Sequence, residues 1–264
     1  MTEPLSSPPE AKPPKLDAKA ISRALLEKND MTRPSHISVS RIIRSVGLDA
    51  RYGPTGPCDA RTVRSGSKAW ICIDERTRGT PRARWSGLHE LTHYIGHPDY
   101  NAIERIHLSG PKSARDHQIE REANAVPPEV LMPEEMFVPY CGADRPTLRE
   151  LDLIGSMFGV SRQALTKRYA KFASAACAVA ECEHGMTKWV IRSKAFRATA
   201  VGRRRLEDAT FAAALSRGES VPTGPRRVAR GTWGIDELDV EMTEHAVRIP
   251  ESGIVLVWLW HAPA

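Results

Sequence analysis

The sequence predicts an α+β protein in which a mostly helical region with a small sheet precedes a smaller α+β domain. Three observations support this fold class. Apolar residues recur at helical spacing through the first two thirds of the chain. Within that region, residues 68–74 (KAWICID) alternate as a half-buried strand does. From about residue 175 the pattern changes to short strand-like runs, so we expect two structural regions.

The first elements along the chain are two predicted helices and two predicted strands. Residues 1–15 contain five prolines and few large apolar groups, so we expect a disordered tail. Helical apolar spacing predicts helices over 16–28 and 36–46. Residues 48–52 and 68–74 have strand character, and the Gly- and Pro-rich stretch between them is predicted to be a loop.

Two longer helices are predicted in the middle of the helical region. The turn at Gly79–Pro81 leads into a helix over about 83–95. A second helix is predicted over about 113–126, and we expect Pro127 and Pro128 to end it. The reason is that proline lacks the backbone N–H that a helix interior needs and clashes with the preceding turn.

A helix-turn-helix-like pair is predicted over residues 148–158 and 162–172. Gly159 can end the first helix in a left-handed conformation, and Ser161 can cap the second. Three polar side chains of the second helix could face DNA in such a motif, namely Arg162, Gln163 and Lys167. Because apolar residues occupy much of the same helix, we favour a packing or substrate-docking role over DNA binding.

The C-terminal region is predicted to be rich in strands. Residues 254–260 are an uninterrupted run of seven apolar residues, which is typical of a buried central strand. The run is far shorter than the ~20 residues that a bilayer span needs. The other expected elements are a helix over 203–216 and strands over 189–193, 238–242 and 246–249.

Composition and charge are those of an ordinary globular protein, with 264 residues, 41% of them hydrophobic and 27% charged. The N-terminus lacks the apolar core of a signal peptide, so we expect a cytoplasmic protein with no membrane segment. The net charge of +6 is concentrated in residues 191–230, which contain ten basic and three acidic residues. Such a segment can bind nucleic acid electrostatically, but we favour a solvated surface.

Residues 89–93 read His-Glu-Leu-Thr-His, an H-E-x-x-H motif inside the helix predicted over 83–95. Because side chains four residues apart share a helix face, His89 and His93 can bind one metal ion. Zinc is the expected metal, although such a site can also accept Mn²⁺ or Fe²⁺. Glu90 is then the expected catalytic base, because its carboxylate can take a proton from an activated water and pass it to the leaving amine.

Two histidines leave the metal one protein ligand short, and residue spacing alone does not decide which side chain supplies it. His97 is not expected to bind, because Gly96 and Pro98 indicate that the helix ends there. The remaining candidates are His107, His117, Glu120 and Glu122. Asn124 stands four residues after Glu120, so both point the same way on a helix, and its amide could orient a ligand.

The order and spacing of three segments resembles that of the ImmA/IrrE metallo-endopeptidases. The segments are KAWICID, RWSGLHELTHYIGH and IEREANAVPPEVLMP, with 27 residues from His93 to Glu120. The resemblance covers roughly residues 16–172. It implies a zincin-like metalloprotease fold, with zinc bound by His89, His93 and Glu120 and with Glu90 as the catalytic base.

The resemblance also implies a domain organisation and a substrate. The expected parts are a tail (1–15), a zinc metallopeptidase domain (16–145), a helix-turn-helix-like pair (146–175) and a C-terminal sensor or docking domain (176–264). Members of the family act in bacteria and their phages, where they cleave helix-turn-helix transcriptional repressors during stress or phage-immunity responses. A repressor of this kind is therefore the expected protein partner.

Two further expectations and two alternatives complete the interpretation. Glu122 is expected at the surface, and the strand over 68–74 is expected to bind an extended peptide along a free edge. One alternative is a DNA-binding transcriptional regulator with a structural or degenerate metal site. The other is a catalytically silent substrate-binding protein. The intact Glu90 argues against both, because metal binding alone does not need that carboxylate.

Overall fold

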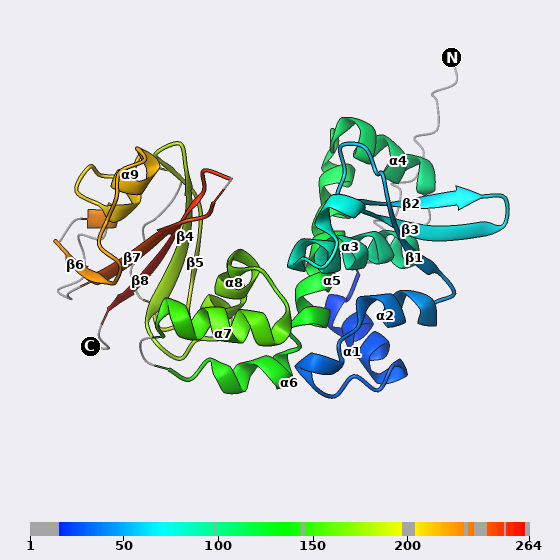
Figure 1. Ribbon diagram of the computed structural model, residues 1–264, viewed down its shortest axis with the longest axis horizontal. Helices are drawn as coiled ribbons and strands as arrows, with labels where there is room; N and C mark the ends of the chain where they lie inside the picture. Colours follow the sequence, from blue (N-terminus) through cyan, green and yellow to red (C-terminus); the bar gives the residue numbers. More distant parts are fainter. Residues whose placement is uncertain are drawn as a thin grey trace, which may run out of the picture. The chain divides into compact units, whose positions relative to one another are not determined.

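The structure, a computed structural model, has a mixed α+β architecture (Figure 1). It describes residues 16–97, 99–143, 146–196, 204–229, 232–234, 242–250 and 252–261, so the predicted tail over 1–15 lies outside the described residues. Two compact units are present. The first comprises Met1–Asp30, Val39–Arg78 and Ser86–Val130, and the second comprises Met31–Ser38, Gly79–Trp85 and Leu131–Ala264. The first holds helices with a three-stranded sheet and the second a five-stranded antiparallel sheet, which confirms the α+β prediction.

Strand β3 (Lys68–Asp74) lies at the centre of the three-stranded sheet. It pairs in parallel with β1 (Asp49–Gly53) and antiparallel with β2 (Ala60–Ser65), so the strand order is β1-β3-β2. The predicted bounds of β3 are confirmed, but the expected free edge is wrong because both of its edges are paired. Strand β2 falls in the predicted loop. Its buried side chains are the small Ala60 and Thr62, which carry no strong strand signal.

The helices that lie wholly or largely in the first unit are α1 (Ala18–Lys28), α2 (Val39–Ser45), α3 (Pro81–Gly96), α4 (Tyr100–Ser109) and α5 (Ala114–Leu131). Helix α1 begins after Asp17, whose Oδ1 accepts a hydrogen bond from Lys19 N at 3.0 Å. The helix predicted over 36–46 is shorter than expected. Pro34–His36 forms a separate 3-10 turn, and α2 begins at Val39. Helix α4 was not predicted.

A glycine allows α3 to pack closely against the sheet. A Cβ atom on Gly87 would lie 3.2 Å from Ile73 Cδ1 and 3.3 Å from Val39 Cγ1, which is tighter than ordinary contact. Leu88 and Leu91 on the same helix are also fully buried. Burial of each such leucine contributes about 1.5–3 kcal/mol, so the H-E-x-x-H segment is held rigidly beside β3.

Helix α5 continues through Pro127 and Pro128 to Leu131, so the prediction that these prolines end the helix is wrong. Each proline removes one N–H from the helix interior. The neighbouring apolar residues compensate, because Val126, Val130 and Leu131 are at most 1% exposed. Tertiary packing therefore outweighs the local cost of the two prolines.

The C-terminal stretch of the second unit starts with a short helix, α6 (Glu134–Phe137), and continues with α7 (Leu148–Phe158) and α8 (Arg162–Phe172). The bounds of α7 and α8 agree with the predicted pair. Gly159 adopts the expected left-handed conformation, with φ 61°, and Ser161 Oγ accepts a hydrogen bond from Ala164 N at 3.2 Å.

The three side chains of α8 that could have faced DNA are engaged inside the second unit. Arg162 Nε donates to Asp152 Oδ1 at 2.7 Å, and Gln163 Nε2 donates to a carboxylate oxygen of the buried Glu181. The Lys167 ammonium lies 4.1 Å from the centre of the Trp189 ring. These contacts favour the packing role of the helix pair.

The five-stranded sheet of the second unit is antiparallel throughout and has the order β5-β4-β8-β7-β6. Its strands are β4 (Cys177–Glu183), β5 (Met186–Arg192), β6 (Arg226–Val228), β7 (Met242–Arg248) and β8 (Val255–His261). Strand β8 is central, as predicted, and both of its faces are covered. On one face Val257 packs in a cluster with Ala212 of α9 (Phe211–Ser216), and on the other Trp258 meets the Tyr169 ring of α8.

Two C-terminal predictions need correction. The helix predicted over 203–216 is shorter: α9 begins at Phe211, and Arg205 instead makes a β-bridge to Met186. The two strands predicted over 238–242 and 246–249 correspond to the single strand β7, with residues 238–241 outside the described part of the chain. Among the described residues, every helix is too short or too polar to cross a membrane.

Candidate metal centre

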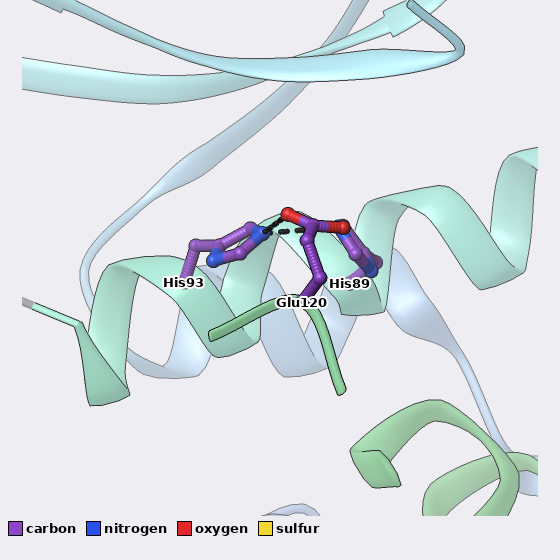
Figure 2. Close-up of side chains that lie close together, drawn as sticks. All are labelled: His89, His93 and Glu120. Carbon is purple, nitrogen blue, oxygen red and sulfur yellow. Dashed lines mark hydrogen bonds and ion pairs between the residues drawn. The ribbon is translucent and has the colours of Figure 1, made fainter. Parts of the chain in front are cut away.

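Three side chains converge on one point in the first unit. His89 and His93 project from α3, and Glu120 projects from α5 toward both imidazoles (Figure 2). The Nε2 atoms of the two histidines are 3.0 Å apart. Glu120 Oε1 lies 3.3 Å from His93 Nε2, and Glu120 Oε2 lies 3.7 Å from His89 Nε2. The four atoms could therefore surround a single metal ion.

A hydrogen bond to Asn124 decides which nitrogen of His89 faces the cluster. Asn124 Nδ2 donates to the backbone oxygen of Glu120 at 2.8 Å, so Asn124 Oδ1 is left to accept. That oxygen lies 3.2 Å from His89 Nδ1, which must then carry the proton. The lone pair of His89 is consequently on Nε2 and points to the cluster, as the predicted orienting role of Asn124 requires.

His93 is in turn backed by a buried carboxylate. His93 Nδ1 lies 3.1 Å from His97 Nδ1, and His97 Nε2 lies 3.1 Å from Glu122 Oε2. Glu122 is 8% exposed, so the expectation that it is a surface residue is wrong. The sequence placed Glu120 and Glu122 on opposite flanks of the apolar stripe of α5, and the imidazole at His97 gives the second carboxylate a buried partner.

The charges of the three candidate ligands suit a cation. Burial, with the nearby His93, lowers the pKa of His89, so its imidazole is neutral at neutral pH. Burial raises the pKa of Glu120, but interactions with His93 and His89 lower it more, so the carboxylate is ionised. In the described part of the chain Glu120 Oε1 is buried with no hydrogen-bond donor. A neutral imidazole and an ionised carboxylate therefore face one point beside the His93 ring, which is an arrangement that a metal ion can satisfy.

Glu90 is buried beside this cluster and is held at both of its oxygens. Its Oε2 accepts hydrogen bonds from Thr62 N at 2.8 Å and from Thr62 Oγ1 at 3.1 Å. Its Oε1 lies 3.2 Å from His107 Nε2 on α4. Burial raises the pKa of Glu90, but His107 and the cluster histidines lower it more, so the group stays ionised. Burial lowers the pKa of His107, but Glu90 raises it more, so the net shift is upward.

The two remaining histidine candidates, His107 and His117, fit the ligand role less well than Glu120. His107 belongs to a second group that could hold a metal, together with Glu90 and His93. That group fits less well, because both oxygens of Glu90 are already engaged. His117 is exposed and belongs to neither group. The geometry thus brings Glu120, rather than His107, His117 or Glu122, to the two histidines of the motif.

Comparison with known proteins agrees with this geometry. Residues 47–169 match the family Peptidase_M78, described as the IrrE N-terminal-like domain. The chain carries an ImmA/IrrE-family metalloprotease domain. This confirms the resemblance seen in the sequence, and the match over residues 47–169 agrees with a His and Glu cluster that could hold a metal.

A protein of known structure shares the fold of this chain. A Mycobacterium tuberculosis transcriptional regulator of known structure is similar, with a TM-score of 0.58 and 13% sequence identity. The similarity covers 92% of this chain and 75% of that one. No curated protein matches this chain.

Sequence reasoning missed Thr62 as a partner of Glu90 and missed the contact between His97 and Glu122. Thr62 lies in a segment predicted to be a loop, 28 residues before the carboxylate that it holds. The distance between His97 and Glu122 along the chain is 25 residues. Neither pair has a local pattern in the sequence, because both contacts depend on how α3 packs against β2 and α5.

Proposed function

We propose that this protein is a zinc-dependent endopeptidase of zincin-like fold that cleaves a helix-turn-helix transcriptional repressor. The observation that carries the proposal is the meeting of two imidazoles and one carboxylate beside an ionised, anchored second carboxylate. Two imidazole nitrogens and one carboxylate are a usual protein ligand set for catalytic zinc. Glu90 adds a base that metal binding alone does not need.

When bound, zinc supplies a Lewis acid that polarises the substrate carbonyl and lowers the pKa of water. The proton transfers are carried out by Glu90. Thr62 holds Glu90 Oε2 through two hydrogen bonds, whereas Oε1 faces the single ring nitrogen of His107 and has a second lone pair that can accept the proton of the attacking water. The same oxygen then passes the proton to the leaving amine. His107 Nε2 lies 3.2 Å from Glu90 Oε1 and keeps this oxygen oriented before the reaction.

The three-stranded sheet offers a place for an extended peptide beside this base. Among the described residues β2 pairs with β3 alone, so its outer edge is open. Thr62 belongs to β2 and contacts Glu90 directly, so the edge passes the reacting centre. Backbone pairing with that edge would align a peptide there. We propose that the region over 176–264 acts as a sensor or docking domain, while the peptidase domain over 16–145 carries out the cleavage.

Incubation with a candidate substrate tests the proposal. The zinc-loaded protein is mixed with a helix-turn-helix repressor encoded beside its gene, and products are identified by mass spectrometry. We expect cleavage at a defined bond, loss of cleavage with a chelator, and recovery on adding Zn²⁺. Parallel addition of Mn²⁺ and Fe²⁺ identifies the working metal. Equal cleavage by wild type and by Glu90→Gln would contradict the mechanism.

The DNA-binding alternative has less support. Besides the engaged residues of α8, three described cations of the segment 191–230 lie within 3.5 Å of a carboxylate, namely Arg204, Arg217 and Arg226. A DNA-binding assay at several salt concentrations tests this alternative, because binding through phosphates weakens steeply with salt. Salt-sensitive, tight binding to a defined sequence would favour the regulator.

A further inference from the structure

We propose that Glu122 and His97 together set the tautomer of His93, and that this setting determines how tightly the cluster binds zinc. The inference rests on the proposed metal site and adds two positioning residues to it. The three side chains form an unbroken line from α5 to the cluster, with contacts of 3.1 Å between Glu122 Oε2 and His97 Nε2 and of 3.1 Å between His97 Nδ1 and His93 Nδ1.

The first link fixes the proton on His97. An ionised carboxylate can accept hydrogen bonds but cannot donate them, so His97 Nε2 must carry a proton. A neutral imidazole has one protonated nitrogen, and its Nδ1 is then an acceptor. Gln118 Nε2 donates to Glu122 Oε1 at 2.9 Å, which keeps the other oxygen directed at His97.

The contact between His97 and His93 then fixes the tautomer of His93. Because His97 Nδ1 accepts, His93 Nδ1 must donate and therefore holds the ring proton. The lone pair of His93 is left on Nε2, which faces His89 Nε2 at 3.0 Å and Glu120 Oε1 at 3.3 Å. In the opposite tautomer a proton on Nε2 would point into the cluster and would have to leave before a metal could bind.

Burial makes this line effective. His93, His97 and Glu122 are 2%, 9% and 8% exposed, so water competes little for their hydrogen bonds. His89 depends on the single amide of Asn124, whereas His93 depends on a second imidazole that is itself held by a charged group. The two metal-facing histidines are thus oriented by different means. The contacts that orient His93 can be broken by substitution at either of two residues, His97 or Glu122.

Zinc affinity provides the first test, measured by competition with a chelator in the purified full-length protein. Partners that orient metal-bound histidines are typically worth ~10–100-fold in affinity, so we expect Glu122→Ala and His97→Phe to weaken zinc binding by that factor. Glu122→Gln keeps the size of the side chain and guards against loss of folding, and we expect a smaller loss. Wild-type zinc affinity in all folded variants would overturn the proposal.

Asp116→Asn is the matched control, because Asp116 is another buried carboxylate on α5. It is held by Arg105 at 2.7 Å and by the backbone of Ser113 at 3.1 Å, and none of its hydrogen bonds in the described part of the chain reaches the cluster. We expect this variant to unfold at a lower temperature with unchanged zinc affinity. A loss of affinity equal to that of Glu122→Ala would mean that any buried charge lost from α5 has the same effect, which would overturn the specific role of Glu122.

Nitrogen NMR of the His93 ring in the metal-free protein gives a second readout, independent of zinc and of peptide cleavage. We expect the proton on Nδ1 in the wild type and a mixture of tautomers in Glu122→Ala and His97→Phe. An unchanged His93 tautomer in these variants would overturn the inference. Failure of the wild type to cleave any repressor, with the tautomer and affinity effects present, would contradict the proposed protease and leave the inference standing.

Discussion

The two units of the molecule each bury a carboxylate, and the partners of these carboxylates differ in kind. In the second unit Glu244 is 0% exposed, and its Oε1 accepts a hydrogen bond from Ala212 N at 3.0 Å. Its Oε2 accepts from Phe211 N at 3.2 Å and lies 3.3 Å from Arg226 Nη2. All these donors keep their protons at any ordinary pH, so the carboxylate joins α9 to β7 permanently.

Two carboxylates at the candidate metal centre of the first unit have partners of another kind. Glu90 and Glu120 face imidazoles, whose protons can leave, and one buried oxygen of Glu120 has no donor in the described part of the chain. A buried charge whose partners are complete and permanent contributes to the architecture. A buried charge whose partners can change protonation, or are missing, indicates a site built for an ion or a reaction.

The largest effect should follow from Glu120→Ala, which removes one of the three ligands. We expect the variant to lose most of its bound zinc and all measurable cleavage, because two histidines alone hold zinc weakly. Zinc stoichiometry of the purified protein measures this directly. Full zinc content in Glu120→Ala, combined with its loss in His107→Ala, would move the third ligand to His107 and reverse our reading of the two carboxylates.

Glu90→Gln should have the next largest effect, and on cleavage alone. The amide keeps the shape of the side chain but cannot accept the proton, and loss of a general base typically lowers the rate ~10²–10⁴-fold. Zinc content should stay at the wild-type level. If cleavage of the same repressor proceeds at the wild-type rate, Glu90 is a structural carboxylate like Glu244, and the comparison between the units fails.

Glu244→Ala should act on stability and not on zinc. It leaves the Arg226 guanidinium and two amides of α9 without their acceptor, and breaking a buried ion pair at one partner costs about 3 kcal/mol. Denaturant unfolding, followed by a probe in the second unit, measures this loss. Zinc affinity of the folded protein serves as the internal control. A drop in affinity would show that the role of Glu244 is not confined to its own unit.

The smallest predicted effect is that of Thr62→Val. This change removes the hydroxyl hydrogen bond to Glu90 Oε2 and keeps the one from the backbone N–H. A lost hydrogen bond of about 1 kcal/mol corresponds to roughly a fivefold lower kcat, with KM and zinc content unchanged. A change in KM alone would indicate that Thr62 contacts the peptide and does not hold the base.

Local patterns in the sequence were sufficient where short-range physics decides the structure. The bounds of α7 and α8 follow from a left-handed glycine and an N-cap serine, and those of β3 follow from alternation. The central position of β8 follows from a run that is apolar on both faces, which only a strand covered on both sides can bury. The H-E-x-x-H spacing on α3 placed two imidazoles on one face in the same way.

Tertiary structure decided everything that depends on residues far apart in the chain. Packing of Val126 and Leu131 carried α5 through two prolines, and pairing with β3 made a strand of a polar segment that looks like a loop. Helical periodicity could not choose between Glu120 and Glu122, because both flank the same apolar stripe. The folded chain gave one carboxylate to the metal cluster and the other to His97. The sequence by itself thus determined the chemistry available to the protein, whereas long-range packing assigned each carboxylate its partner, because partners are set by distances that no local pattern contains.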